Sequence, residues 1–276
     1  MNLGKFSPAD LAQFLALYPK LLEGEREARD LLKEKGDMIL APDMPGPTWS
    51  HLYELPAKEH FITGMAALGA QDQLKQLAQS SNQIQEILYI AESLDEDEDE
   101  EDWEPTDEER EALRKALGVV FAMTMSVLKS LRSLMVFGVY LNDLVALVRA
   151  GGAQGDKALL QAVKIDPTVL ACPSVNARIS RAILLDDHAF LAKVHRAMEG
   201  KLTKREQRNY QYMRIVLEVL HEAGAPKLSQ DDLYTLFVEE LKLVRGERDA
   251  DEGDVANALR QFAYQFMKQK AVSQNA

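Results

Sequence analysis

The longest apolar pattern of the chain runs from Leu113 to Val148, and it restricts the possible folds more than any other feature of the sequence. Apolar and small residues recur in it at alternating spacings of four and three, with no proline between them, as they do along one face of an α-helix. One helix over these 36 residues would be about 54 Å long. A second apolar face, with residues such as Met123, indicates burial from more than one side. We therefore expect a long buried central helix or a kinked helix pair over about residues 107–149, with Gly138 as its weakest point.

The rest of the chain also has the pattern of helices, and signals for strands are scarce. Ser7 and Pro8 have the form of a cap and the first residue of a helix, which we expect to end or kink at Pro19 before a second helix over residues 23–35. Further helices are expected over residues 57–68, 71–94, 157–164, 173–185, 188–198, 203–223, 229–243 and 254–270. The predicted fold class is therefore all-α.

A dense acidic run spans residues 95–109, where twelve of fifteen residues are Asp or Glu and none is Lys or Arg. The whole chain has 44 acidic and 32 basic residues, so the net charge of −12 belongs to this run and the remainder is formally neutral. Like charges at this density oppose packing into a core, while a capping box from Thr106 to Glu109 assigns the last residues to the next helix. We expect two helical domains, 1–94 and 106–276, joined by an acidic disordered linker at 95–105.

The sequence also favours a cytoplasmic protein without membrane association. No apolar run of the kind found in secretory signals follows the first residues. The apolar segments 118–128 and 133–141 are shorter than the roughly 20 residues of a bilayer span. Cys172 is the single cysteine, so an intramolecular disulfide cannot form and a Cys-rich zinc site is excluded. A chain without disulfides is typical of a reducing compartment such as the cytosol.

The acidic run can be read in two ways. It is either a solvated linker or a ligand for a basic surface, on a protein partner or within the same chain. In the second case Trp103 would anchor the contact, and Asp99, Glu100 and Glu101 would supply the charge.

A basic stretch between residues 178 and 214 could receive that run or bind nucleic acid. The candidate residues are Arg178, Arg181, Lys193, Arg196, Lys204, Arg205 and Arg208. The alternative is a solvated pair of helices whose basic residues pair with acids elsewhere. Residues 151–276 contain 18 basic and 17 acidic residues, so this part of the chain is close to neutral. Nucleic-acid-binding domains are usually far more basic, which favours this alternative.

The common catalytic and nucleotide-binding motifs are absent from the sequence, which contains no HExxH, P-loop, GxGxxG, GxSxG or EF-hand pattern. Two histidines and two glutamates between His51 and His60 could form a metal or acid–base site, although surface and capping roles are commoner for such residues. An enzyme would need a site assembled from distant residues such as His188, His195 and Glu199. We therefore predict no catalytic residue, no metal and no cofactor.

Three functions stay open at this stage. The first is a non-enzymatic helical interaction or adaptor protein that binds a protein partner or a second copy of itself. The second is a nucleic-acid-binding regulator that uses the basic residues between 178 and 214, with the acidic run masking them. The third is an enzyme with an assembled site.

Overall fold

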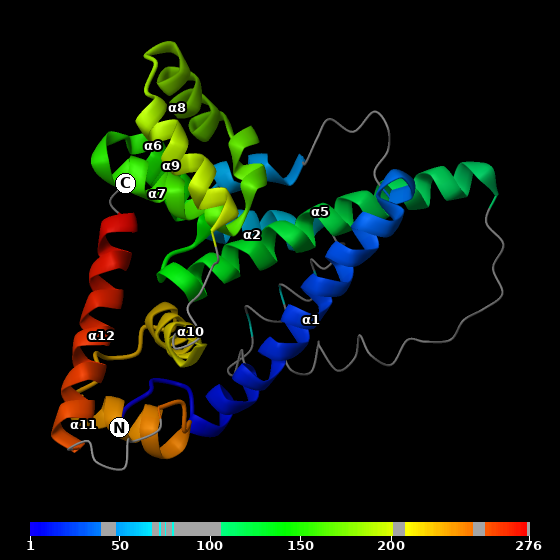
Figure 1. Ribbon diagram of the computed structural model, residues 1–276. Helices are drawn as coiled ribbons and strands as arrows, with labels where there is room; N and C mark the ends of the chain where they lie inside the picture. Colours follow the sequence, from blue (N-terminus) through cyan, green and yellow to red (C-terminus); the bar gives the residue numbers. More distant parts are fainter. Residues whose placement is uncertain are drawn as a thin grey trace.

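The computed structural model describes residues 1–39, 48–67, 106–200, 208–244 and 252–274, together with residues 72, 75 and 79. Over these residues the chain is almost entirely helical and has no strand, so the all-α prediction is confirmed (Figure 1). The predicted linker at 95–105 lies outside the described residues, and the division into two domains stays a prediction.

The helices follow one another along the chain in thirteen described segments. They are α1 (Pro8–Ile39), the 3₁₀ helix η1 (Thr48–Glu54), α2 (Ala57–Ala67), α5 (Asp107–Phe137), α6 (Leu141–Ala150), α7 (Gly152–Ile165), the 3₁₀ helix η2 (Pro167–Ala171), α8 (Pro173–Leu184), α9 (His188–Glu199), α10 (Arg208–Glu222), α11 (Gln230–Tyr234), the π-helical η4 (Thr235–Glu240) and α12 (Glu252–Gln274).

Helix α7 begins at Gly152, five residues before the predicted start at 157, and two more predicted helix boundaries are wrong. Helix α1 does not end at Pro19 but continues through it to Ile39. A proline inside a helix removes one backbone hydrogen bond, and the burial of Leu11 and Leu15 stabilises the turns that precede it. The second error is the single helix predicted over 229–243, where a short α-helix changes into a π-helical turn before the chain leaves the helix at Leu241.

The central pattern forms a kinked helix pair, α5 and α6, as predicted. Helix α5 begins at the expected capping box, in which the Thr106 amide donates to Glu109 Oε2 at 2.8 Å and the Glu109 amide donates to Thr106 Oγ1 at 3.3 Å. It ends at Gly138, which has a left-handed φ of 78° and donates its amide to the Leu134 carbonyl. The left-handed backbone angle favours glycine at this position, whereas the nearest atom to an added Cβ, Oε1 of Gln269 at 2.7 Å, is the end of a flexible side chain that can move away.

The buried apolar residues form two cores. The first lies within α6 to α9 together with η1 and η2, and includes Tyr53 and Leu159. The second joins the start of α1 to α10, α11, η4 and α12, and includes Leu11 and Phe237 (Figure 1). Helix α5 contributes to both, with Val136 in the first and Leu134 in the second. The N-terminal segments and α5 therefore hold the two cores together.

One stretch of α5, Val120–Phe137, is long and apolar enough to cross a membrane by length and composition alone. The core helix of a water-soluble protein passes the same test. In the structure, α5 packs against α1, α2 and α10, and Met125 and Met135 are buried. The absence of membrane association stays a prediction.

A buried hydrogen-bond network joins η1 and α2 to α5 and α6. The side-chain amide of Asn142 donates to the carbonyls of Leu52 and Leu55 at 3.1 and 2.9 Å. The same Nδ2 lies 3.1 Å from Nδ1 of His60, whose Nε2 lies 2.6 Å from Ser126 Oγ. Ser126 Oγ donates to the Met123 carbonyl at 2.7 Å, so it can accept a hydrogen bond from Nε2 of His60. Burial lowers the pKa of His60 below its usual 6.5, although the contact with Asn142 opposes that shift.

The lowered pKa of His60 predicts a loss of stability in mild acid. Below pH 6.5 the unfolded chain takes up a proton that the folded chain resists, so the free energy of unfolding falls by up to about 1.4 kcal/mol per pH unit until the folded pKa is reached. Urea unfolding at about one pH unit above 6.5 and at about one unit below it measures this slope. We expect His60→Gln to reduce the slope, whereas His188→Gln, at an exposed site on α9, should leave it unchanged. Equal slopes in the three proteins would contradict the prediction.

Candidate functional site

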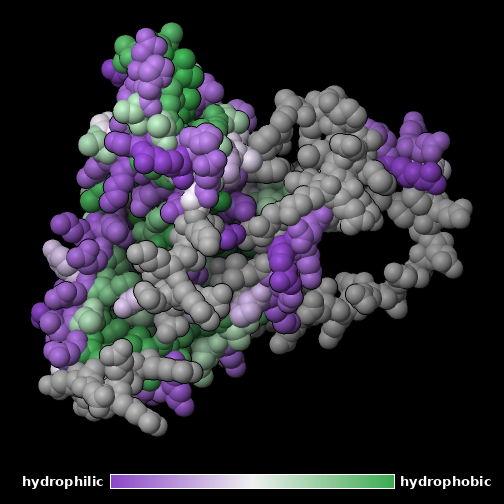
Figure 2. Space-filling view, in the orientation of Figure 1, coloured by the Kyte–Doolittle hydropathy of each residue, from purple (hydrophilic) through white to green (hydrophobic). Residues whose placement is uncertain are grey.

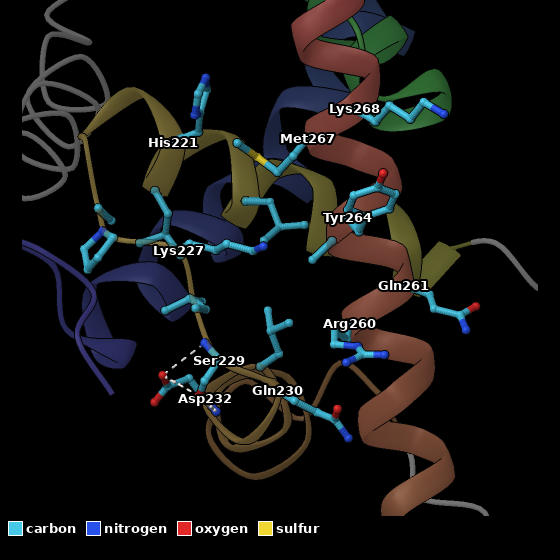
Figure 3. Close-up of a pocket in the computed structure, with 17 residues that line it drawn as sticks. His221, Lys227, Ser229, Gln230, Asp232, Arg260, Gln261, Tyr264, Met267 and Lys268 are labelled. Atoms are coloured by element: carbon cyan, nitrogen blue, oxygen red, sulfur yellow. Dashed lines mark hydrogen bonds between the residues drawn. The ribbon is translucent and has the colours of Figure 1, made fainter.

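A cavity of about 1050 Å³ lies between α12 on one side and α10, α11 and the segment that joins them on the other (Figure 3). We call it the α10–α12 groove. Its floor is apolar, with Leu217 and Leu220 from α10, Leu233 from α11 and Ala263 from α12. Met267 of α12 adds an apolar wall that is 39% exposed. The floor leucines are only 2–7% exposed, so the apolar surface that solvent reaches is the wall formed by Met267 and Tyr264 of α12.

The segment between α10 and α11 places a positive charge at the groove. Gly224, with a φ of 68°, ends α10, and a capping box between Ser229 and Asp232 starts α11. Lys227 lies between these two turns and extends into the space between α10 and α12 (Figure 3). Arg260 of α12 lies at the edge of the groove near Gln230, while Lys268 points away from it (Figure 3).

The one acidic residue that lines the groove is occupied by the helix cap. Both Oγ and the amide of Ser229 donate to Asp232 Oδ2, at 2.8 and 3.2 Å. These hydrogen bonds hold the pKa of Asp232 below its ordinary value. Among the described residues, no carboxylate lies within ion-pair distance of Lys227. The groove thus combines an apolar floor with an excess of positive charge at its mouth.

Two polar side chains that line the groove are not directed at its centre. The hydroxyl of Ser229 serves the helix cap, and His221 points away from the cavity (Figure 3). Within the described part of the groove, no nucleophile faces a base at hydrogen-bond distance. An apolar floor with few polar groups at its rim is the usual composition of a site that takes an apolar group next to a charged one.

Helix α12 is held against α10 by a buried ion pair. Nζ of Lys270 lies 2.6 Å from Glu218 Oε1, and both side chains are about 5% exposed or less. The ammonium also lies 4.9 Å from the centre of the Tyr140 ring. Burial raises the pKa of Glu218, and the nearby Lys270 acts against that shift. The pair therefore joins α10 to α12, the two helices between which the groove lies.

Large apolar side chains are uncovered at the turn between α8 and α9. Ile183, Leu184 and Leu185 are 58, 83 and 68% exposed, and Asp186 follows them with a φ of 52°. Aspartate tolerates this left-handed conformation better than most residues. We call residues 183–186 the α8–α9 tip. Figure 2 shows hydrophobic surface at the top of the molecule, where Figure 1 places α8, and again between α10 and α12.

The basic residues predicted from the sequence to bind nucleic acid differ in their exposure and in their partners. Arg178 is committed inside the protein, because its guanidinium donates to both carboxylate oxygens of Asp156 at 2.7 and 3.0 Å and lies 3.8 Å from the centre of the Phe190 ring. Arg181 of α8 and the α9 residues Lys193 and Arg196 are exposed, and Arg208 is the first residue of α10. Lys204, Arg205, Trp103, Asp99, Glu100 and Glu101 lie outside the described residues. Nucleic-acid binding and partner binding by these residues stay predictions.

The acid–base candidates do not converge. His60 is buried in its hydrogen-bond network, while Glu54 binds Arg149 and accepts from the Ser174 amide at 2.8 Å. Burial would raise the pKa of Glu54, but the hydrogen bonds from Ser174 and Arg149 outweigh it and hold the pKa below its ordinary value.

The other histidine candidates lie on the exposed side of α9. His195 Nδ1 lies 3.6 Å from Glu199 Oε2, and both side chains are mostly exposed; His188 is exposed at the start of the same helix. Among the described residues, no group of three His, Cys, Asp or Glu side chains could hold a metal ion.

Cys172 is buried in the first core, where Sγ donates to the Ser50 carbonyl at 2.8 Å. Burial raises the pKa of its thiol to about 12, with smaller effects from the nearby carboxylates Glu54 and Asp166. Such a thiol is a poor nucleophile near neutral pH, since the thiolate is the reactive form.

A scan against protein-family models, a search of curated proteins and a search of solved structures each found no match for this chain.

Proposed function

We propose that the chain is a non-enzymatic helical interaction protein that binds a protein partner through the α10–α12 groove. The observation that carries the proposal is the groove itself, with an exposed apolar wall at Met267 and Tyr264 and with Lys227 and Arg260 at its mouth. An apolar surface flanked by charge is a common docking site for a helix or loop of another protein. Its exposed apolar walls, Met267 and Tyr264, would gain free energy from being removed from water.

A protein partner is favoured over a small molecule for two reasons. The cavity of about 1050 Å³ is at or above the upper end of the roughly 300–1,000 Å³ that small-molecule pockets span, and it is open at its mouth. A second apolar surface, the α8–α9 tip, is uncovered on the same molecule. Apolar surfaces of this kind are typical of protein contacts. We place the protein in the cytoplasm, because its only cysteine is a buried thiol.

Photo-crosslinking from the groove tests this function. Tyr264 is 61% exposed and lines the groove, so a benzoylphenylalanine at this position should capture the bound protein in the source cells. We expect discrete protein adducts, identified by mass spectrometry. Their yield should fall at least about tenfold when Met267→Glu adds a charge to the wall, a change of about 1.4 kcal/mol in binding.

The matched control places benzoylphenylalanine at Phe61, an exposed aromatic position on α2 outside the groove. Adducts that are the same at both positions, or that persist with Met267→Glu, would contradict the proposal. Adducts with nucleic acid only, together with a mobility shift that weakens between two salt concentrations, would favour the nucleic-acid alternative instead.

A further inference from the structure

The α8–α9 tip and the α10–α12 groove lie at opposite ends of the molecule. Figure 1 shows the turn beyond α8 at the top and α11, which forms one side of the groove, at the bottom, with α5 and α10 between them. The tip of one molecule therefore cannot reach its own groove without unfolding. Both surfaces are available at once to other molecules.

The two surfaces have complementary chemistry. The tip presents three aliphatic side chains, with Leu184 the most exposed, and the groove presents a floor of leucines with the wall at Met267. Asp186 follows the aliphatic residues at the tip, and Lys227 extends into the groove. An apolar group next to a carboxylate would thus meet an apolar floor next to an ammonium.

The charges around the tip support the match. Asp187 is engaged locally, since its Oδ1 accepts from the Phe190 amide at 3.0 Å and its Oδ2 lies 3.9 Å from Arg178. Within the described residues, the carboxylate of Asp186 lies within ion-pair distance of no cation. Asp186 is therefore the acid that the tip has available for a partner.

We propose that the occupant of the groove is the α8–α9 tip of a second copy of this chain. This inference rests on the proposed function and names its partner. The contact joins two different surfaces, so each molecule keeps one free tip and one free groove, and association continues head to tail until a ring closes or a filament forms. A tip of a few side chains buries less than the roughly 1,000 Å² of a stable interface, so the contact is expected to be weak and dependent on concentration.

Mixing two variants tests this arrangement. Leu184→Glu removes the apolar tip and keeps the groove, while Met267→Glu impairs the groove and keeps the tip. Sedimentation velocity of the wild-type protein, up to about 1 mM, should show a weight-average mass that rises with concentration. Each variant alone should stay monomeric. Their equimolar mixture should form a dimer and stop there, because it contains one intact tip and one intact groove.

Ile62→Glu is the matched control, since it adds the same charge at an exposed apolar residue of α2 outside both surfaces. It should associate like the wild-type protein. Far-ultraviolet circular dichroism and thermal unfolding of the variants verify that each is folded. Association of either single variant at the wild-type level, or a mixture that stays monomeric, would overturn the inference.

A charge exchange gives an independent readout. Lys227→Asp and Asp186→Lys should each weaken association about tenfold, and the doubly substituted protein should recover most of it. Lysine is acceptable at the left-handed position of Asp186, because Lys242 has a φ of 51° in this protein. Additive losses without recovery would count against the pairing.

The outcome also separates this inference from the proposed function. If the wild-type protein is monomeric at every concentration and the crosslink from Tyr264 yields a different protein, the second copy is wrong and the interaction function stands. If Tyr264 crosslinks only to a second copy of the chain while the variants behave as expected in solution, self-association stands and a foreign partner does not.

Discussion

Replacing Glu218 with leucine is expected to lower the free energy of unfolding by about 3–5 kcal/mol, because the Lys270 ammonium would stay buried without the carboxylate that now lies 2.6 Å away. Urea or guanidinium unfolding followed by circular dichroism measures the loss. Glu222→Leu is the control, since Glu222 is exposed on the same helix. A loss for Glu218→Leu no larger than for the control would contradict the role of the pair.

The double variant Glu218→Leu/Lys270→Met sharpens this test. Replacing a buried ion pair by apolar residues of similar size is often neutral or stabilising, because the cost of removing two charges from water disappears. We expect the double variant to recover most of the loss of Glu218→Leu. The difference from additivity is the coupling free energy between the two side chains.

Replacing Asn142 with alanine is also expected to cost about 3–5 kcal/mol, because it leaves several buried polar groups without their partner at roughly 1–3 kcal/mol each. The carbonyls of Leu52 and Leu55 would lose a donor, and Ser130 Oγ, which now donates to Asn142 Oδ1 at 2.6 Å, would lose its acceptor. Denaturant unfolding measures the total effect. Asn176→Ala, at an exposed site on α8, should cost little.

Hydrogen exchange locates the Asn142 effect. The network attaches η1 and α2 to α5 and α6, so exchange should accelerate in η1 and α2 before it accelerates in α11. Uniform acceleration across the protein would mean that the amide stabilises the whole fold and does not act as a local anchor.

The sequence predicts well those features that depend on neighbouring residues. The kinked pair α5 and α6, the capping boxes at Thr106 and Ser229 and the break at Gly138 follow from spacing and side-chain type within a few turns. Helix α1 shows the limit, because local preference favours an end or a kink at Pro19, whereas the helix continues through it to Ile39 and packs against α5. Packing between distant segments decides such cases.

The candidate site was harder to predict, since the walls of the groove come from residues up to about fifty positions apart. No local pattern brings Leu220 and Met267 together. Likewise, the pairing of Arg178 with Asp156 is invisible in the sequence, where Arg178 has the same appearance as the exposed Arg181. The sequence of the tip contains three aliphatic residues directly before two aspartates at a turn. Such a run does not predict exposure, because it is equally typical of a buried helix end.

The position of Cys172 has a practical consequence for all of these experiments. Its sulfur is fully buried, and its thiol is protonated at neutral pH, so the folded protein should react with maleimides almost as if it had no cysteine. Fluorophores can therefore be attached to single cysteines introduced at the tip or the groove without first removing the native one. The rate at which Cys172 itself is labelled would then report how often the segment around Ser50 separates from η2. This rate measures the opening of the first core without any substitution.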